Sequence, residues 1–318
     1  MHTDPIPRGG GICFVGSTLI ISFLAVLFDY RQLTQYYYIY IAIAIVFLTG
    51  MYDDKNGISP KAKFLFILLA SILLFANGIY IKSLGTFLGQ GISLPLLFAI
   101  PFTAFAIVGF TNALNLIDGL DGLAGTITVI ILGAFLWIGY AYHDYLMILL
   151  SSLFMASITA FLFFNWNPAK VFMGDSGSLT LGFVVSILAI RATDHIEPTA
   201  VLFIVVLPVL DTFIVMTRRI QRGISPFSAS KTHMHHILYS RYRDVKYTVI
   251  ILLFIQIAFT IIGLQFRNSD GFLSLILFAI LFFIFLNLFD ERIRHRKKVG
   301  NNKKSKKDKE VKETTQES

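Results

Sequence analysis

The chain consists mainly of long apolar runs separated by short polar segments. A helix of about 20 apolar residues crosses the hydrocarbon core of a bilayer, where the backbone must satisfy its own hydrogen bonds. Only 14% of the residues are charged and 55% are hydrophobic, whereas a soluble domain is about one quarter charged. We therefore predict an all-α polytopic membrane protein with about ten transmembrane helices. The expected spans are 11–28, 36–51, 63–77, 95–114, 123–142, 145–163, 178–191, 199–217, 247–266 and 271–289.

The remaining segments suggest one membrane domain and one tail. Residues 1–290 form the predicted membrane domain, and the basic, low-complexity tail 291–318 is expected to be disordered. Residues 79–94 are expected to form a small hairpin outside the membrane, and 218–246 is the longest polar loop. The single cysteine, Cys13, excludes a disulfide framework or a Cys-rich metal site within the chain.

The basic residues fall on one side of the predicted membrane. Alternating sides from span to span places 23 of the 27 Lys and Arg residues together with the N-terminus, the C-terminal tail and four loops. By the positive-inside rule that side is cytoplasmic, so we expect a multi-pass protein of the cell inner (plasma) membrane. The net charge of +8 does not indicate nucleic acid, because eleven of these residues lie in the tail, where they anchor topology and meet anionic membrane lipids. The four loops are 52–62, 115–122, 164–177 and 218–246.

The most unusual polar stretch is Asn112–Gly125, which lies between two apolar runs. Its two Asn and two Asp residues are spaced three apart, so on a helix end they would share one face. Carboxylates at a membrane edge are costly and usually functional. The alternative is a polar helix cap and turn, since Asn, Asp and Gly are turn residues. The four residues are Asn112, Asn115, Asp118 and Asp121.

Two further clusters lie near the N-terminus on the same predicted side. Asp53 and Asp54 are adjacent carboxylates, so one pKa should be raised and that group could act as a base, while Lys63 could hold a phosphate. Pro5–Gly11 combines prolines with three glycines, giving a backbone that can approach a ligand closely. The alternatives are a solvated interhelical loop and a flexible N-terminal loop.

The loop 164–177 suggests a metal and phosphate site. The sequence Gly-Asp-Ser-Gly-Ser at Gly174–Ser178 would open a helix with free N–H groups, which suit phosphate oxygens. Asp175 and the side-chain carbonyl of Asn165 are hard oxygen ligands of the kind that Mg²⁺ prefers. The alternative is an N-cap of the following helix.

Asp211 and a histidine loop complete the polar inventory. Asp211 lies in an apolar span two helical turns before Arg218, and a structural salt bridge between them is the favoured interpretation. The loop holds His233, His235 and His236. Without Cys or a distant His on the same face a transition-metal site is weakly supported, and hydrogen bonding to a pyrophosphate fits this basic loop better.

These features together indicate one type of chemistry. The chain has no P-loop motif, no Ser-His-Asp order and no Cys nucleophile. Acids at a lipid boundary, a hard-metal site and a basic loop suit phosphoryl transfer from a soluble anionic donor to a membrane-embedded acceptor.

The motifs resemble those of the polyprenyl-phosphate N-acetylhexosamine-1-phosphate transferases, of the undecaprenyl-phosphate N-acetylglucosamine-1-phosphate type. The resemblance covers Pro5 to Phe289. It implies transfer of a sugar-1-phosphate from a UDP-sugar to a polyprenyl phosphate, with release of UMP and a requirement for Mg²⁺, with Mn²⁺ as an alternative. The matching motifs are Pro-Arg-Gly-Gly-Gly from Pro7, Asp53-Asp54, Asn112–Ala124, Phe172–Ser178 and His233-Met234-His235-His236.

The resemblance also implies roles for individual residues. Asp53, Asp54 and Asp175 would be catalytic, one of the first two as the base. Asn165 and Asp175 would hold the metal. The residues implied in substrate binding are Lys63 for phosphate, Asn115, Asp118 and Asp121 for the uridine, and His233, His235 and His236 for the pyrophosphate.

The chain departs from the family pattern at two places. Members usually have a further helix before the Pro-Arg-Gly-Gly motif, and we expect the start at Met1 to be truncated or misassigned. An Asp often stands three residues before the first histidine, where this chain has Ser230.

The motifs favour UDP-N-acetylglucosamine as donor and undecaprenyl phosphate as acceptor. The muramoyl-pentapeptide enzymes carry Pro-Thr-Met-Gly-Gly and His-His-His where this chain has Pro-Arg-Gly-Gly-Gly and His-Met-His-His. Another UDP-N-acetylhexosamine and UDP-N-acetylmuramoyl-pentapeptide stay open as donors, and a homodimer stays open. A secondary transporter is the alternative of another class, but it should show paired half-sequences and broken midplane helices, and the sequence indicates neither.

Overall fold

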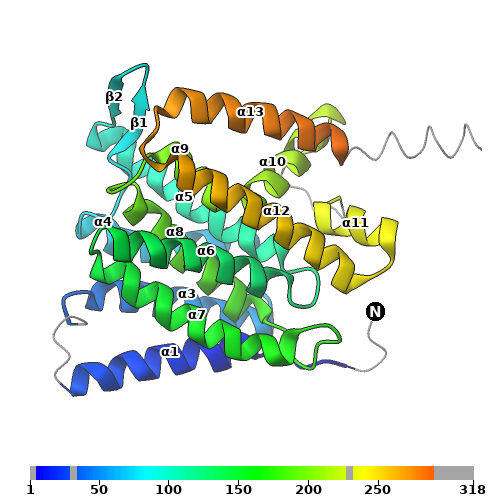
Figure 1. The fold of residues 1–318 in the computed structure, drawn as a ribbon. Coiled ribbons are helices and arrows are strands. Elements are labelled where there is room, and N and C mark those ends of the chain that lie inside the picture. Colours follow the sequence, from blue (N-terminus) through cyan, green and yellow to red (C-terminus); the bar gives the residue numbers. More distant parts are fainter. Residues whose placement is uncertain (1–4, 29–33, 227–231, 290–318) are drawn as a thin grey trace, which may run out of the picture. The chain divides into compact units, whose positions relative to one another are not determined.

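The computed structural model describes residues 5–28, 34–226 and 232–289, and these are mostly helical (Figure 1). The chain divides into two compact units, Met1–Phe278 and Ala279–Ser318. The second unit is described only to residue 289, so the predicted disordered tail lies outside the described residues. Ser230 also lies outside them, in the gap between residues 226 and 232. The helices are α1 (Gly10–Leu27), α3 (Tyr37–Asn56), α4 (Pro60–Ala76), α5 (Leu96–Ile117), α6 (Leu123–Ala141), α7 (Tyr145–Asn165), α8 (Gly174–Ala192), α9 (Pro198–Ile204), α10 (Val206–Gln221), α11 (Met234–Tyr242), α12 (Val245–Gln265), the 3₁₀ turn η1 (Phe266–Asn268) and α13 (Gly271–Leu288).

Every predicted apolar run is helical, but fewer than ten helices qualify as membrane spans. Within the described ranges, six helices are long and apolar enough to cross a membrane, or seven if α9 and α10 count as one bent span. The all-α polytopic class is therefore confirmed, whereas the predicted number of about ten spans is not shown. The six are α5, α6, α7, α8, α12 together with η1, and α13.

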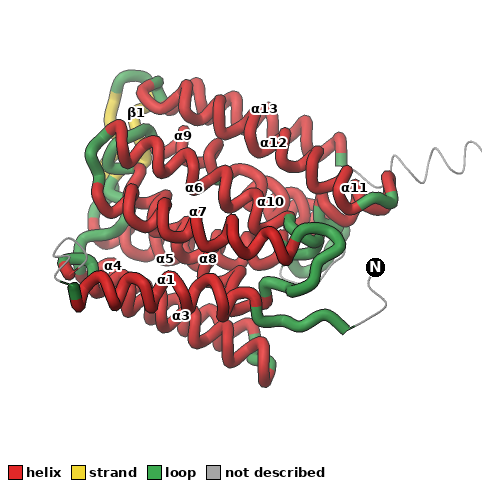
Figure 2. The backbone as a smooth tube through the Cα atoms, turned by 60° about the horizontal axis from the view of Figure 1, so that its bottom comes forward, coloured by secondary structure: helices red, strands yellow, loops and turns green. Residues whose placement is uncertain are grey.

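Helix α8 is the central helix of the first unit. In its most apolar stretch 83% of the residues are buried, against at most 61% in the other candidate spans. It packs mainly on α3 and α5 and also contacts α1, α6 and α7. Figure 2 shows the helices of the chain as a tube, with other helices in front of α8. Small residues permit this close packing, because a Cβ at Gly182 would lie 2.7 Å from the Cα of Thr111 in α5.

A second close crossing joins α3 to the start of α8. A Cβ at Gly50 would lie 2.5 Å from the carbonyl oxygen of Asp175 and from the Cα of Ser176. Any side chain larger than hydrogen would therefore separate the helices. The crossing brings the last turn of α3, which carries the adjacent carboxylates, beside the first turn of α8.

The predicted span 199–217 is not one straight helix. It breaks at Val205, where α9 and α10 meet at an angle of 87°. Pro208 has no N–H to donate to the carbonyl of Ile204, and Gln256 of α12 supplies one instead, with its Nε2 2.7 Å from that oxygen. The Gln256 Oε1 also accepts from the N–H of Leu207 at 3.3 Å. This bend was not predicted from the sequence, and whether it lies at the membrane midplane stays untested.

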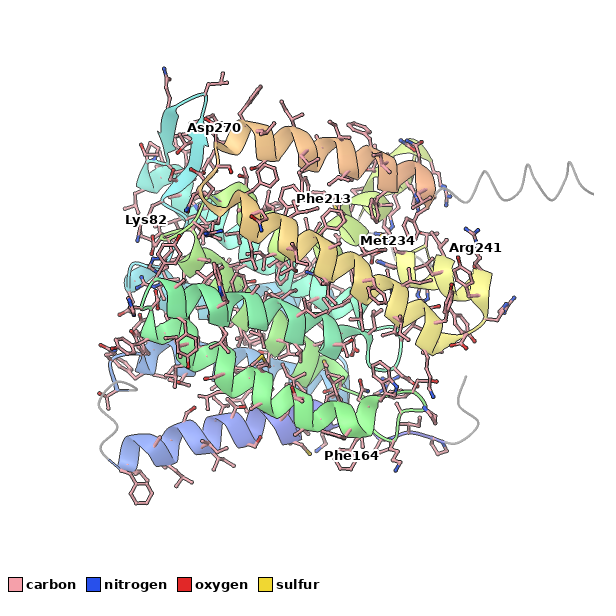
Figure 3. The ribbon with its side chains drawn as sticks, viewed as in Figure 1. Lys82, Phe164, Phe213, Met234, Arg241 and Asp270 are labelled. Atoms are coloured by element: carbon pink, nitrogen blue, oxygen red, sulfur yellow. The ribbon has the colours of Figure 1, made fainter. Side chains whose placement is uncertain are left out.

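The segment 79–94 contains the two strands that the structure describes, β1 (Ser83–Phe87) and β2 (Gln90–Ser93), paired antiparallel. Their turn places Leu88 and Gly89 at φ 52° and 77°, as a tight hairpin requires. Figure 3 shows Lys82 and Asp270 at this end of the first unit and Met234 and Arg241 at the other. The polar clusters described next lie at the end marked by Met234.

Candidate active site

The site forms where α3, α5 and α7 end and α4, α6 and α8 begin. Three chain reversals meet there, so residues more than 100 positions apart in the sequence become neighbours. Lys63 at the start of α4 forms ion pairs with Asp53 of α3 and Asp175 of α8. The structure therefore brings together three of the predicted site residues and gives Lys63 two carboxylate partners.

Asp53 is held in its ionised form. Burial opposes ionisation, but hydrogen bonding with Asp175, Lys63 and the N–H of Ile58 outweighs it and holds the pKa of Asp53 below its ordinary value. The Ile58 nitrogen lies 2.6 Å from the Asp53 Oδ1. The expected rise of one pKa in the Asp53-Asp54 pair is therefore not found at Asp53.

Asp54 caps the central helix. Its Oδ1 accepts from the N–H of Asp175 at 2.7 Å and its Oδ2 from the N–H of Ser176 at 3.0 Å. The prediction that these N–H groups are free for a phosphate is wrong, because a carboxylate already occupies them. Gly174 fits this arrangement with φ +74°, and a Cβ there would lie 2.7 Å from the Asp54 Oδ2.

Two members of the Asn112–Gly125 motif bind other parts of the protein. The Asn115 Nδ2 donates to the Ser178 Oγ at 2.8 Å. The Asp121 Oδ2 accepts from the Asn167 Nδ2 at 2.8 Å and from the N–H of Ala169 at 3.0 Å. These bonds fasten the α5–α6 turn to α8 and to the α7–α8 loop, and the predicted uridine contacts of both residues stay predictions.

Asp118, at the C-terminal end of α5, is the carboxyl group with the strongest electrostatic conflict. Burial first, and then the charges of Asp175, Asp121 and Asp54, raise its pKa to about 7. Burial is the largest cause of this shift, and the negative charges of the three neighbouring carboxylates add to it. Titratable groups perturbed in this way concentrate at functional sites.

The side chain of Asn165 has partners within the protein. Its Oδ1 accepts from the N–H of Gly122 at 3.0 Å, and its Nδ2 donates to the carbonyl of Val171 at 2.9 Å. This buried amide therefore orders two site loops, and its predicted metal contact stays a prediction. In the described part of the chain no three His, Cys, Asp or Glu side chains form a metal-binding group. Mg²⁺ commonly uses one or two carboxylates together with water and substrate phosphates, and the acidic surplus beside Asp175 fits that mode.

The histidine loop packs against the same motif. The His235 ring lies against Gly119, where a Cβ would be 3.1 Å from the ring carbon Cδ2. Its two ring nitrogens are buried and find no hydrogen-bond partner among the described residues. Burial lowers the pKa of His235 to about 3, so the ring is neutral. The ring of His236 is 4.1 Å away, centroid to centroid.

Asp211 has two partners that the sequence did not indicate. It accepts from the His233 Nδ1 at 2.7 Å and from the N–H of Met234 at 2.6 Å. The favoured salt bridge with Arg218 stays a prediction. The sequence signal was present, since a lone acid in an apolar span needs a partner. The bonds to His233 and Met234 were not predicted, because the turn that returns α11 to α10 cannot be read from local spacing.

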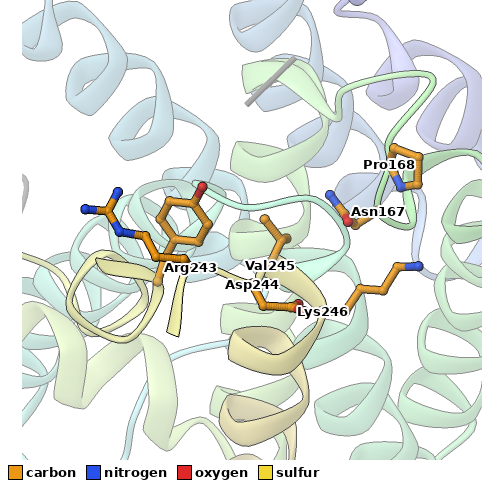
Figure 4. A pocket seen from close by; sticks show the side chains of 7 residues that line it. Asn167, Pro168, Arg243, Asp244, Val245 and Lys246 are labelled. Atoms are coloured by element: carbon orange, nitrogen blue, oxygen red, sulfur yellow. The ribbon is translucent and has the colours of Figure 1, made fainter. Parts of the chain in front are cut away.

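A pocket of about 460 Å³ opens beside the α7–α8 loop (Figure 4). Arg243, Asp244 and Lys246 line it together with Asn167, whose amide donates to Asp121. The pocket therefore holds two cationic side chains and one acid, and Asn167 links it to the acidic motif.

The N-terminal glycine motif has a structural role. The N–H groups of Gly10 and Gly11 donate to the carbonyls of Phe172 and Met173 at 2.9 and 2.8 Å. Gly11 also lies against the backbone of Gly177. The glycine backbone, which was predicted to approach a ligand closely, thus lies close to the start of α8.

Known proteins are similar to this chain in sequence. Residues 36–193 match glycosyl transferase family 4. A protein of Bacillus subtilis (strain 168) named "probable undecaprenyl-phosphate N-acetylglucosaminyl 1-phosphate transferase" is 33% identical over 92% of this chain and 81% of its own length. The undecaprenyl-phosphate α-N-acetylglucosaminyl 1-phosphate transferase of Yersinia pestis is 31% identical over 74% of this chain and 66% of its own length. A phospho-N-acetylmuramoyl-pentapeptide-transferase of Streptococcus pneumoniae (strain Hungary19A-6) is 34% identical over 72% of this chain and 73% of its own length. The chain therefore belongs to glycosyl transferase family 4.

Proposed function

We propose that the protein transfers N-acetylglucosamine-1-phosphate from UDP-N-acetylglucosamine to undecaprenyl phosphate and releases UMP. This reaction would begin a cell-surface polysaccharide such as an O-antigen or a wall teichoic acid. The carrying observation is the carboxylate cluster around Lys63 at one end of an apolar helix bundle of this family. The names of the Bacillus and Yersinia relatives support the same reaction.

The reaction forms one P–O bond and breaks another. An oxygen of the lipid phosphate attacks the phosphorus that carries the sugar, and the bond to the oxygen of the departing UMP breaks. A polyprenyl phosphate is already largely dianionic near pH 7, since its second pKa is near 6. Little deprotonation is needed, and the main task of the site is to position the phosphates and balance their charge.

The geometry distinguishes the two adjacent acids. Both oxygens of Asp54 accept backbone N–H groups, so Asp54 positions α8 and Asp175. Asp53 shares Lys63 with Asp175 and is the better candidate to face the lipid phosphate. Lys63 would move between these carboxylates and an incoming phosphate as the charge of the site changes.

Asp175 is the proposed charged ligand of Mg²⁺, with Mn²⁺ as the alternative. It lies in the first turn of the central helix, close enough to Asp118 for their charges to interact. The metal would supply positive charge to the phosphates of the donor. Loss of UMP release in EDTA and its return with added Mg²⁺ would support this assignment.

The site end is proposed to face the cytosol, because the alternation of spans predicted from the sequence assigns 23 of the 27 basic residues to the side of the loops that carry the site motifs. Single cysteines at Arg241 and at Leu88, both exposed, test it in a Cys13→Ser background. Leu88→Cys should react with an impermeant reagent in intact cells, and Arg241→Cys only after permeabilisation. The reverse pattern would contradict the orientation.

The donor is tested with purified protein, undecaprenyl phosphate and each UDP-sugar in turn. UMP release with UDP-N-acetylglucosamine is expected. The Streptococcus relative makes UDP-N-acetylmuramoyl-pentapeptide the second candidate, and turnover with that donor alone would overturn the assignment. Because transporters also contain broken helices like α9–α10, the assay includes uptake into vesicles, and uptake without UMP release would favour a transporter.

A further inference from the structure

A buried acid and a histidine join α10 to the start of α11. Asp211 is 1% exposed and His233 is 4% exposed. The Asp211 Oδ2 lies 2.7 Å from the His233 Nδ1, and its Oδ1 lies 2.6 Å from the nitrogen of Met234. One carboxylate thus binds both the ring and the backbone of the histidine loop.

We propose that Asp211 is a positioning residue that holds His233 with its Nδ1–H toward the carboxylate and its Nε2 available to the bound UDP-sugar. The proposal rests on the function proposed above. An ionised carboxylate only accepts hydrogen bonds, so the Nδ1 must carry the proton in this pair. The tautomer of the neutral ring is then fixed, and the Nε2 is the nitrogen that remains for a ligand.

The carboxylate fixes the direction of the ring as well as its tautomer. With its Nδ1–H bound to Asp211, the neutral ring offers the Nε2 lone pair, which accepts a hydrogen bond from a donor hydroxyl or from a water bound between the ring and the phosphates. The other titratable and charged groups near the pair are His235 and His236 of α11 and Arg218 of α10.

The direction of α10 depends on the bend that precedes it. Gln256 bonds both sides of the break between α9 and α10, and Asp211 follows Leu207 by about one helical turn. The bend, the acid and the histidine therefore form one connected support for the loop. The Met234 bond adds to this support, since a carboxylate at a helix start fixes the first turn.

A matched control pair exists at the other end of the helices. Asp144, with 1% side-chain exposure, accepts from the His195 Nε2 at 2.7 Å and from the N–H of Met147 at 3.2 Å. It therefore makes the same two kinds of hydrogen bond as Asp211, but away from the proposed active site. Asp144→Asn reports what the loss of a buried acid does to stability alone.

The experiment compares Asp211→Asn, Asp211→Glu, His233→Gln, the Asp211→Asn/His233→Gln double variant and Asp144→Asn in purified full-length protein. UMP release from UDP-N-acetylglucosamine is measured across pH. Asp211→Asn should lower kcat about 10- to 100-fold, as the loss of a supporting partner commonly does. Asp211→Glu should restore part of the rate, and Asp211→Asn should add little to the loss already caused by His233→Gln. Asp144→Asn should lower the thermal midpoint and leave kcat unchanged.

Two kinetic outcomes would overturn the proposal. In one, Asp211→Asn lowers kcat as much in the His233→Gln background as it does alone. In the other, Asp144→Asn lowers kcat as much as Asp211→Asn does. Nitrogen-15 NMR of labelled histidines gives a readout independent of turnover, with the His233 signal assigned by its absence in His233→Gln. An Nδ1-protonated ring that changes in Asp211→Asn supports the proposal even if no UDP-sugar turns over, and an unchanged ring rejects it. Absence of turnover in the unsubstituted protein would count against the proposed function.

Discussion

The two ends of helices α7 and α8 differ in how far the charge of their aspartates is compensated by cations. At the end marked by the hairpin, Asp144 accepts from Arg191 at 2.6 Å and from His195, and Asp194 accepts from Arg191 and Lys82. At the other end, Asp53 and Asp175 share Lys63, and Asp118 is surrounded by further acids. The first end is balanced, and the second carries surplus negative charge.

The pKa values follow this difference. Burial alone would raise the pKa of Asp144, but hydrogen bonds from His195 and Met147 and the charge of Arg191 bring it below its ordinary value. The pKa of Asp118 rises to about 7 instead. Acids that stabilise a fold are paired with cations, whereas a site that must receive a metal or a cation-bearing ligand leaves part of its negative charge uncompensated. The comparison therefore separates structural acids from candidate functional ones.

The largest expected effect is at Asp175, which we compare with Asp194 beyond the far end of the same helix. Asp175→Ala should lower the rate of UMP release roughly a thousandfold or more, because the proposed metal loses its charged ligand. Asp194→Ala should change the rate less than about twofold, since a surface charge pair is worth little. Kinetics on folded, membrane-inserted protein decides. Equal rate losses in the two variants would remove the functional distinction between the ends.

Gly174→Ala should have the second largest effect. The new Cβ would meet Asp54 at 2.7 Å in a backbone with φ +74°, so the start of α8 and Asp175 must move. A displacement of about 1 Å in such a site costs on the order of a hundredfold in rate. Gly78→Ala is the control, because its φ is +79° with nothing within 4 Å of the new Cβ, and it should lose only stability. A normal rate in Gly174→Ala would show that this capped helix start is not required for turnover.

The sequence predicted the helices better than it predicted their contacts. Apolar runs locate helices because the bilayer imposes length and composition, so each expected span contains a helix. The break at Val205 was missed since it depends on Pro208 together with a glutamine some 50 residues away in the chain. Long-range pairing of this kind has no local sequence pattern.

The candidate site shows the same limit. The motifs correctly named residues that the fold assembles, such as Lys63 with Asp53 and Asp175. They did not reveal that Asp54 accepts from the N–H groups of Asp175 and Ser176. Residue types indicate which chemistry is available, whereas the partner of each group is decided by helix crossings such as the one at Gly50.

The dependence of the free energy of unfolding on pH should differ between the two ends of the helices. Asp118 has a raised pKa, so the folded state binds more protons than the unfolded state between about pH 4 and pH 7, and the free energy of unfolding falls as pH rises through this range. Asp144 has a lowered pKa, so its contribution is present at neutral pH and is lost only as pH falls below about 4. At pH 8, Asp118→Asn should therefore raise the thermal midpoint. Asp144→Asn should lower it, with a loss of roughly 3 kcal/mol for a broken buried pair. Shifts of the same sign in both variants would contradict the comparison.

The smallest expected effect is at Lys82, the exposed counterpart of Lys63. The Lys82 side chain is 50% exposed and its Nζ lies 2.9 Å from the Asp194 Oδ1, but Arg191 also binds that carboxylate at 3.2 Å. Lys82→Met removes one of two cations in contact with water, so it should cost less than about 0.5 kcal/mol and leave the rate unchanged. Lys63→Met removes the lysine that two partly buried carboxylates share, so the carboxylates should repel and the rate should fall. Thermal midpoints at low and high salt, with rates for both variants, measure the contrast. A loss of stability in Lys82→Met as large as that in Asp144→Asn would show that the balanced end depends on its surface charges and not on the buried acid.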